Sequence, residues 1–153
     1  LPVAALILAD IDNFKKINDS FGHPVGDKIL ATVASVIRAN VRKDLFVART
    51  GGEEFAIIVE GNTPDEVMVI CERIRCALET RSFRNSRSGV QYGPITISLG
   101  YSMGSQADDP SGLYANADIA LYHAKHAGRN RSVFFDEAMR NDYAGKNWLI
   151  YRG

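Results

Sequence analysis

An unbroken apolar run from Val3 to Leu8 is the feature that most constrains the fold of this chain. It leads into two aspartates, Asp10 and Asp12, without any polar alternation before them. A half-buried strand alternates apolar and polar residues, whereas a continuous apolar run is typical of a strand that is covered on both faces. We therefore expect a central strand of a sheet here, with two carboxylates where that strand ends.

Further hydrophobic patterns predict the remaining elements. Helical spacing covers 14–20, 27–40, 63–78 and 110–124, and strand patterns cover 45–48, 55–59, 95–101 and 133–135. The polar stretch 81–93 predicts a loop or a weak edge hairpin. The core order of strand, helix, strand, strand, helix, strand predicts an α+β fold. It is a ferredoxin-like split β-α-β arrangement, with a central antiparallel sheet and its helices on one face.

The charge balance limits the classes of partner. The 153 residues include 18 Lys and Arg and 18 Asp and Glu, so the formal net charge is zero. Proteins that coat nucleic acid or bind membranes through basic segments need a large excess of positive charge. The opening apolar run is also far shorter than the ~20 residues of a membrane span. We expect one domain with no nucleic-acid partner and no direct membrane contact.

Two cysteines, Cys71 and Cys76, lie in the third helical pattern. Residues five apart point to different faces of a helix, so we expect no disulfide between them. No group of histidines accompanies them, and a zinc site needs about four ligands. We interpret both as buried thiols of a protein from a reducing compartment.

Acidic residues indicate the chemistry. Asp10 ends the first strand, and Glu53 and Glu54 follow a Gly-Gly turn that the predicted topology places beside it. Carboxylates crowded at one edge of a sheet repel each other, and a hard divalent cation relieves that repulsion. Asp10 together with Glu53 therefore predicts a site for Mg²⁺ or Mn²⁺, which would bind nucleotide phosphates. Asp12, taken alone, is better interpreted as a structural residue at the strand end.

The loop after the first strand predicts a nucleotide site. A loop that enters a helix exposes free N–H groups, which bind anions, and Lys15 adds a point charge for a phosphate. Asn18 and Asp27 are candidates for base recognition, because an Asp carboxylate accepts from both N1–H and N2–H₂ of guanine. Gly52 lets a phosphate approach the backbone. His23 is better interpreted as a residue that structures the loop.

Two basic residues near the end of the last helix, Lys125 and Arg129, allow two interpretations. They can form a solvated helix end that is stabilised by the helix dipole. Alternatively, both can face the phosphates, because residues four apart share one side of a helix. The sequence favours neither interpretation over the other.

Three motifs identify a family that this chain resembles. Gly51–Phe55 reads GGEEF, Asp10–Asp27 matches the family's upstream motif, and Ala117–Asn130 matches the downstream one. In this order and spacing they resemble GGDEF domains, the diguanylate cyclases. The resemblance runs from the first strand to about Phe135. It implies a GGDEF domain over 1–135, without the family's N-terminal helix, and a tail or linker over 136–153.

The resemblance implies a palm-like sheet of the nucleotide-cyclase type and the synthesis of cyclic di-GMP. Each domain binds one GTP, and two domains of a homodimer join two GTP into cyclic di-GMP with release of two pyrophosphates. Two Mg²⁺ or Mn²⁺ ions would serve each active site. The resemblance also implies a cytoplasmic location, either free or as the cytoplasmic part of a membrane-anchored sensor, with sensor or phosphodiesterase domains in the full-length protein.

Roles are carried over by position. Asp10, the Ile11 carbonyl and Glu53 would hold the metals, and Glu53 would help to deprotonate the 3′-hydroxyl nucleophile. Asn18 and Asp27 would read guanine, and Gly52 would lie against the nucleotide. The phosphates would be held by Lys15, Lys125, Arg129 and the backbone N–H groups of Asn13 and Phe14.

The product-inhibition motif departs from the family pattern. Many cyclases carry Arg-x-x-Asp just before the signature, but here Arg42 is followed by Leu45 in the aspartate position, with Asp44 displaced by one residue. Arg73 matches a helix arginine that contacts the product in relatives. We predict weakened or absent product inhibition.

Two other functions compete with the cyclase. One is a non-catalytic regulatory domain that binds GTP or cyclic di-GMP, attached to a phosphodiesterase domain. The other is an adenylate-type cyclase, which Asp27 disfavours as an acceptor for guanine. The signature acids, the pair expected to read guanine and the three basic residues are all present, and this favours catalysis.

Overall fold

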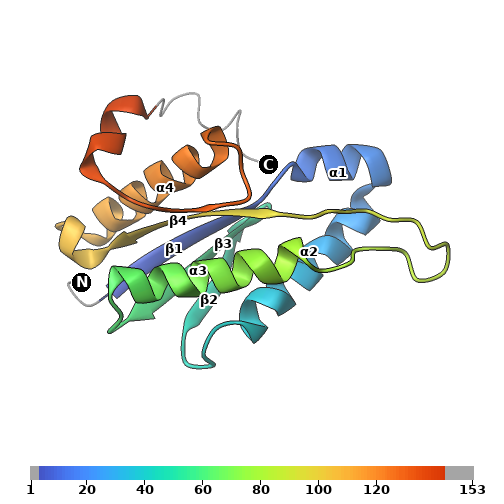
Figure 1. Ribbon diagram of the computed structural model, residues 1–153, viewed down its shortest axis with the longest axis horizontal. Helices are drawn as coiled ribbons and strands as arrows, with labels where there is room; N and C mark the ends of the chain where they lie inside the picture. Colours follow the sequence, from blue (N-terminus) through green and yellow to red (C-terminus); the bar gives the residue numbers. More distant parts are fainter. Residues whose placement is uncertain (1–3, 144–153) are drawn as a thin grey trace.

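The computed structural model describes residues 4–143 of the chain (Figure 1). Five strands form one sheet in the order β2-β3-β1-β4-β5. The elements are β1 (Ala4–Ile11), α1 (Phe14–Phe21), α2 (His23–Ala39), β2 (Phe46–Gly51), β3 (Glu54–Glu60), α3 (Pro64–Glu79), β4 (Ile97–Met103), η1 (Gly104–Gln106), α4 (Pro110–His126), β5 (Ser132–Phe134) and η2 (Glu137–Asp142). The pairs β2–β3, β3–β1 and β1–β4 are antiparallel, and β5 is parallel to β4. The α+β class and the ferredoxin-like order of the core are confirmed.

The strand β1 is central, with β3 on one side and β4 on the other. Residues 5–11 are all buried, as the apolar run predicts. Successive side chains of a strand point to opposite faces. Ile7 packs with the helices α2 and α3, whereas Leu6 and Leu8 pack with α4.

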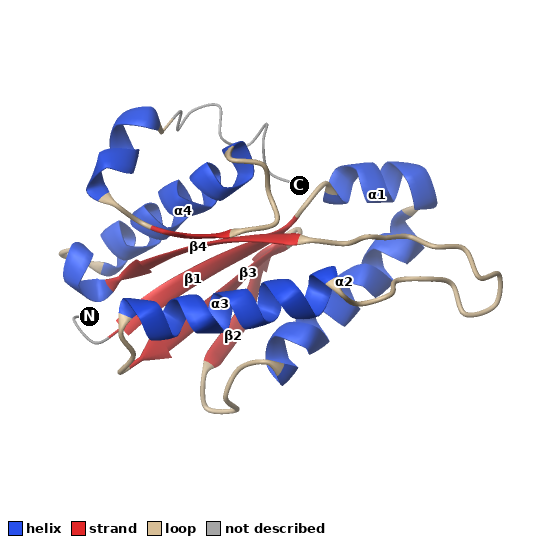
Figure 2. Ribbon diagram, in the orientation of Figure 1, coloured by secondary structure: helices blue, strands red, loops and turns tan. Residues whose placement is uncertain are grey.

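Helices cover both faces of the sheet (Figure 2). The expectation of helices on one face holds for α2 and α3 but is wrong for α4, which lies on the opposite face. Gly100 allows α4 to pack closely against the sheet, because a Cβ at that position would lie 2.1 Å from the Leu121 amide nitrogen. Backbone-to-backbone contact at this glycine brings α4, with its polar side chains, down onto β1 and β4.

The hairpin β2–β3 brings the signature motif to the end of β1. Gly52 has a φ of 42°, a conformation that glycine adopts without steric cost. The Ile11 amide donates to the Glu53 carbonyl at 3.2 Å. The predicted neighbourhood of the first strand's end and the Gly-Gly turn is therefore confirmed.

Several boundaries differ from the prediction. The helix α2 begins at His23, four residues before Asp27, because Gly22 at φ 90° reverses the chain and Pro24 follows in the first turn, where proline suits a helix. The stretch 81–93 has one isolated bridge, between Arg84 and Gln91, and is therefore a minimal hairpin that projects beyond α2 (Figure 1). The predicted tail contains η2, and its remainder from 144 lies outside the described residues. Among residues 4–143, no helix is long and apolar enough to span a membrane.

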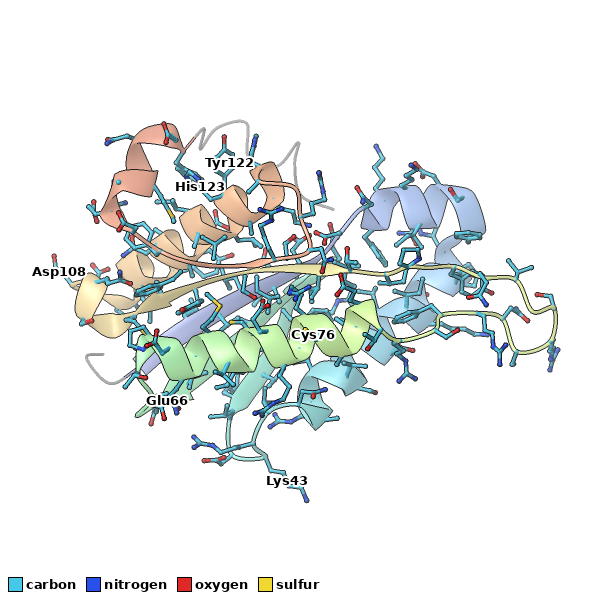
Figure 3. All side chains as sticks on the ribbon, in the orientation of Figure 1. Lys43, Glu66, Cys76, Asp108, Tyr122 and His123 are labelled. Atoms are coloured by element: carbon cyan, nitrogen blue, oxygen red, sulfur yellow. The ribbon has the colours of Figure 1, made fainter. Side chains whose placement is uncertain are left out.

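The interpretation of both cysteines as buried thiols is wrong for one of them. Cys71 is fully buried and Cys76, labelled on α3 in Figure 3, is exposed. Five residues advance a helix by about 140° from one face. The spacing that argues against a disulfide therefore also places the second thiol outside the core.

Candidate active site

Two buried acids face each other across the centre of the sheet. Asp10 of β1 pairs in register with Glu54 of β3, and they are 1% and 5% exposed. Side chains directly opposite each other lie about 5 Å apart at Cβ, and like charges there repel. The Lys125 ammonium lies 2.7 Å from Oδ1 of Asp10, and the Tyr114 hydroxyl donates to Oε1 of Glu54 at 3.0 Å. Each acid thus has a partner from α4.

Asp12 is a structural hub at the end of β1, with more contacts than the structural strand-end residue that the sequence predicted. Its two carboxylate oxygens accept hydrogen bonds from the Thr96 and Ser98 hydroxyls, at 2.8 and 2.6 Å, and from the Asn130 backbone N–H at 3.0 Å. Lys125 adds an ion pair at 3.0 Å. With its lone pairs used in this way, Asp12 ties β4, α4 and the turn after α4 to the end of β1.

The Gly-Gly turn forms one wall of a cavity of about 270 Å³. Glu53 is half-buried there, beside the carboxylates of Asp10 and Glu54. Arg49 closes the turn from outside by donating to the Gly52 carbonyl at 2.7 Å. The cavity is lined by Asp10, Thr50, Gly51, Gly52, Glu53, Glu54 and Tyr114.

The donors at this cavity fit a hard cation. Asp10, Glu53 and Glu54 present oxygen atoms, and no Cys or His lines the cavity among the described residues. Such donors suit Mg²⁺ or Mn²⁺. No cluster of three or more Asp, Glu, His or Cys side chains arranged to hold an ion occurs within residues 4–143.

The residues predicted to read a base lie at α1 and α2. The Oδ1 atom of Asn18 is buried and has no hydrogen-bond partner among the described residues. Gly26 makes room for this amide, because a Cβ at position 26 would lie 1.8 Å from that oxygen. Asp27, the next residue, is exposed at one end of a groove of about 790 Å³ that runs between α2 and the β2–β3 hairpin, with Leu30 and Phe55 in its lining. A buried acceptor that lacks a donor suits a site for a ligand that donates.

The residues predicted to hold phosphates differ in their surroundings. Asn13, at φ 57°, precedes α1, and the first N–H groups of a helix lack intrahelical acceptors. Lys15 is exposed, and Nε of Arg129 is buried without a partner among the described residues. Lys125 is only 2% exposed, so a solvated helix end is wrong for it. Its ammonium lies between Asp10 and Asp12.

The structure explains the altered Arg-x-x-Asp motif that precedes the GGEEF sequence. Leu45 is 7% exposed and packs in the core, where an aspartate would be unfavourable. Arg42 and Asp44 are exposed and pair with each other at 3.4 Å. Arg42 and Arg73 line a common cavity of about 280 Å³.

Sequence reasoning missed two residues of this site. Tyr114 was not singled out, although it lies 11 residues before Lys125, a spacing that places both on one side of a helix. Gly26 was only part of a motif, because its close contact with Asn18 depends on how α1 packs against α2.

Comparisons with known proteins define the class and then the family. The fold is that of an α+β domain with an oxygen-lined cavity at the end of its central strand. The family model described as "Diguanylate cyclase, GGDEF domain" matches residues 3–131. The chain belongs to the GGDEF domain family.

Curated relatives include the probable diguanylate cyclase DgcT of Escherichia coli, 39% identical over 132 residues, and the response regulator PleD of Caulobacter vibrioides, 41% identical over 133. Each alignment covers 86% of this chain and 29% of the relative. The chain therefore spans less than a third of these proteins.

Solved structures are similar over nearly the whole domain. The GGDEF domain of DgcB from Caulobacter crescentus, in complex with c-di-GMP, has a TM-score of 0.83 and 36% identity, and the match covers 86% of this chain and 77% of that one. The active GGEEF domain of a diguanylate cyclase from Vibrio cholerae has a TM-score of 0.78 and 33% identity, and the match covers 88% of this chain and 83% of that one.

Proposed function

We propose that this chain is a diguanylate cyclase module that condenses two GTP into cyclic di-GMP and two pyrophosphates. The observation that carries the proposal is the β1–β3 pairing, which brings Asp10 to the Gly-Gly turn with Glu53 and Glu54. Family membership and relatives named as diguanylate cyclases support it. An adenylate-type cyclase is disfavoured, because Asp27 suits the paired donors of guanine.

The cation is assigned to Asp10 and Glu53. Asp10, the Ile11 carbonyl and Glu53 would hold Mg²⁺ or Mn²⁺, with two ions in each site, and Glu54 lines the same cavity. Bound cations would supply charge stabilisation for the oxygens around the reacting phosphorus. Lys125 holds Asp10 in place and balances part of the negative charge.

The nucleotide is assigned to the surrounding residues. Asn18 and Asp27 read guanine, and the orphaned Oδ1 of Asn18 supports this role. The triphosphate is assigned to Lys15, Lys125, Arg129 and the backbone N–H groups of Asn13 and Phe14, with Gly52 against the nucleotide. The buried, unpartnered Nε of Arg129 supports its part in this set.

The chemistry requires two copies of the domain. Glu53 helps to remove the proton of a 3′-hydroxyl, the 3′-oxygen attacks the α-phosphorus of the GTP on the partner copy, and pyrophosphate leaves. The second attack in the opposite direction closes the ring. Because each copy holds one substrate, the rate depends on the effective concentration of one site at the other.

Regulation and context follow from the same assignment. We infer weak or absent product inhibition, since Leu45 replaces the aspartate of the inhibitory motif and packs in the core.

The domain acts in the cytoplasm, alone or as part of a membrane-anchored sensor. Sensor or phosphodiesterase domains belong to the full-length protein, and 136–153 is the tail or linker after a domain over 1–135. Relatives much longer than this chain support that organisation.

Product analysis tests the proposal. A dimerised form of the chain is incubated with GTP and Mg²⁺, and the products are separated by chromatography. We expect cyclic di-GMP with pyrophosphate from the parental chain and none from Glu53→Gln, whose fold is retained because the substitution lies at a turn. A folded dimer that binds GTP but forms no cyclic di-GMP contradicts catalysis and supports the regulatory alternative.

A further inference from the structure

We propose that Tyr114 is a positioning residue that acts through Glu54. Its hydroxyl holds the carboxylate of Glu54, which lies opposite Asp10 in the cavity beside the Gly-Gly turn. The inference rests on the proposed function. It extends that function to a residue of α4 that lies outside all three sequence motifs.

The placement of Tyr114 on α4 matches that of Lys125. The two residues are 11 positions apart, which is about three turns, so they share one side of the helix. Each reaches one member of the acid pair: Lys125 contacts Asp10 at 2.7 Å and Tyr114 contacts Glu54 at 3.0 Å. One helix therefore orients both carboxylates from its two ends.

The hydroxyl has a specific effect on Glu54. A glutamate side chain has three rotatable bonds, and fixing them costs entropy that a partner must offset. A hydrogen bond to an ionised carboxylate is stronger than one between neutral groups. Since Glu54 is the first residue of β3 and follows the turn directly, this bond keeps its carboxylate in the cavity before a ligand arrives.

Packing alone does not account for Tyr114. Its side chain is 41% exposed, and it belongs to none of the three core clusters formed by the described residues. The polar contact with Glu54 crosses from α4 to β3, 60 positions away in sequence. Removal of the hydroxyl should therefore change the cavity and leave the fold intact.

The test is Tyr114→Phe, with Tyr143→Phe as a matched control. The Tyr143 hydroxyl donates to Oδ2 of Asp118 on α4 at 3.1 Å, so the control loses the same kind of bond, from a tyrosine hydroxyl to a carboxylate, away from the cavity. Calorimetry measures the affinity for a non-hydrolysable GTP analogue with and without Mg²⁺. We expect Tyr114→Phe to weaken binding in Mg²⁺ by about tenfold, as for one lost hydrogen bond to a charged group. Without Mg²⁺, its affinity stays parental, and the control is parental in both conditions.

A double-mutant cycle establishes the route through Glu54. In a Glu54→Gln background, Tyr114→Phe should cause no further loss of Mg²⁺-dependent affinity. Parental affinity of Tyr114→Phe in Mg²⁺ overturns the inference, as does an equal loss with and without Mg²⁺, which is the signature of a structural role. Failure of the proposed function is distinguishable, because in that case the parental chain itself binds no GTP analogue in Mg²⁺ or forms no cyclic di-GMP.

Discussion

Gly26→Ala separates base recognition from folding. The new Cβ would lie 1.8 Å from Oδ1 of Asn18 and 2.9 Å from its Cγ, so the amide must rotate away. Gly26 lies inside α2 without a positive φ, where alanine is favoured over glycine by about 1 kcal/mol. The new Cβ would also lie 3.2 Å from Cζ of the buried Phe14, which must shift by a few tenths of an ångström. Because the helix preference for alanine offsets part of this cost, we expect a loss of stability of no more than about 1–2 kcal/mol.

The effect on substrate is much larger. A base contact that is lost while its buried partner stays unpaired costs about 1–3 kcal/mol. This predicts a rise in the KM for GTP of about 5- to 150-fold, with a smaller effect on kcat. Steady-state kinetics across GTP concentrations and urea unfolding measure the two quantities on the same preparation.

The matched comparison is Asn18→Ala. We expect it to reproduce the rise in KM, and the Gly26→Ala/Asn18→Ala double variant to show no further rise, because the methyl group then has no amide to displace. A parental KM for folded Gly26→Ala would refute the role of Asn18, and full additivity would refute the steric route between the two residues.

Three further predictions concern other parts of the chain. Asp27→Ala should raise the KM for GTP far more than the Mg²⁺ concentration needed for half-maximal rate; equal changes in both would contradict base recognition. Asp12→Asn should lower the free energy of unfolding by about 1–3 kcal/mol, because the Thr96 and Ser98 hydroxyls and the Asn130 backbone amide lose a charged acceptor, while Lys125 keeps its ion pair with Asp10; an unchanged free energy of unfolding in urea would argue against the hub. Burial raises the pKa of the Cys71 thiol, so its thiolate is suppressed at neutral and mildly alkaline pH, and only exposed Cys76 should react with a thiol reagent; two reactive thiols in the native chain would be inconsistent with the packing of α3.

Much of the fold was predictable because local chemistry specifies it. The apolar run predicted a central strand, and the Gly-Gly turn predicted the hairpin that reaches Asp10. The start of α3 was predictable from Thr63 and Glu66, whose side chains and backbone amides form a reciprocal capping box. Each of these signals lies within a few residues of sequence.

The remaining features depend on contacts between distant segments. That α4 covers the second face depends on Gly100 of β4, which admits the helix backbone. The burial of Lys125 depends on two aspartates more than 110 residues earlier. The hydrogen bond from Tyr114 to Glu54 depends on the packing of α4 against the sheet. No periodicity in the sequence encodes these pairings.

The central claim is that Asp10 and Glu53 share a divalent cation with the nucleotide. A crystal of the chain with Mn²⁺ and a non-hydrolysable GTP analogue, measured for anomalous scattering, tests it directly. We predict an anomalous peak about 2 Å from a carboxylate oxygen of each residue and from a phosphate oxygen. A bound nucleotide whose cation contacts neither carboxylate would contradict the account.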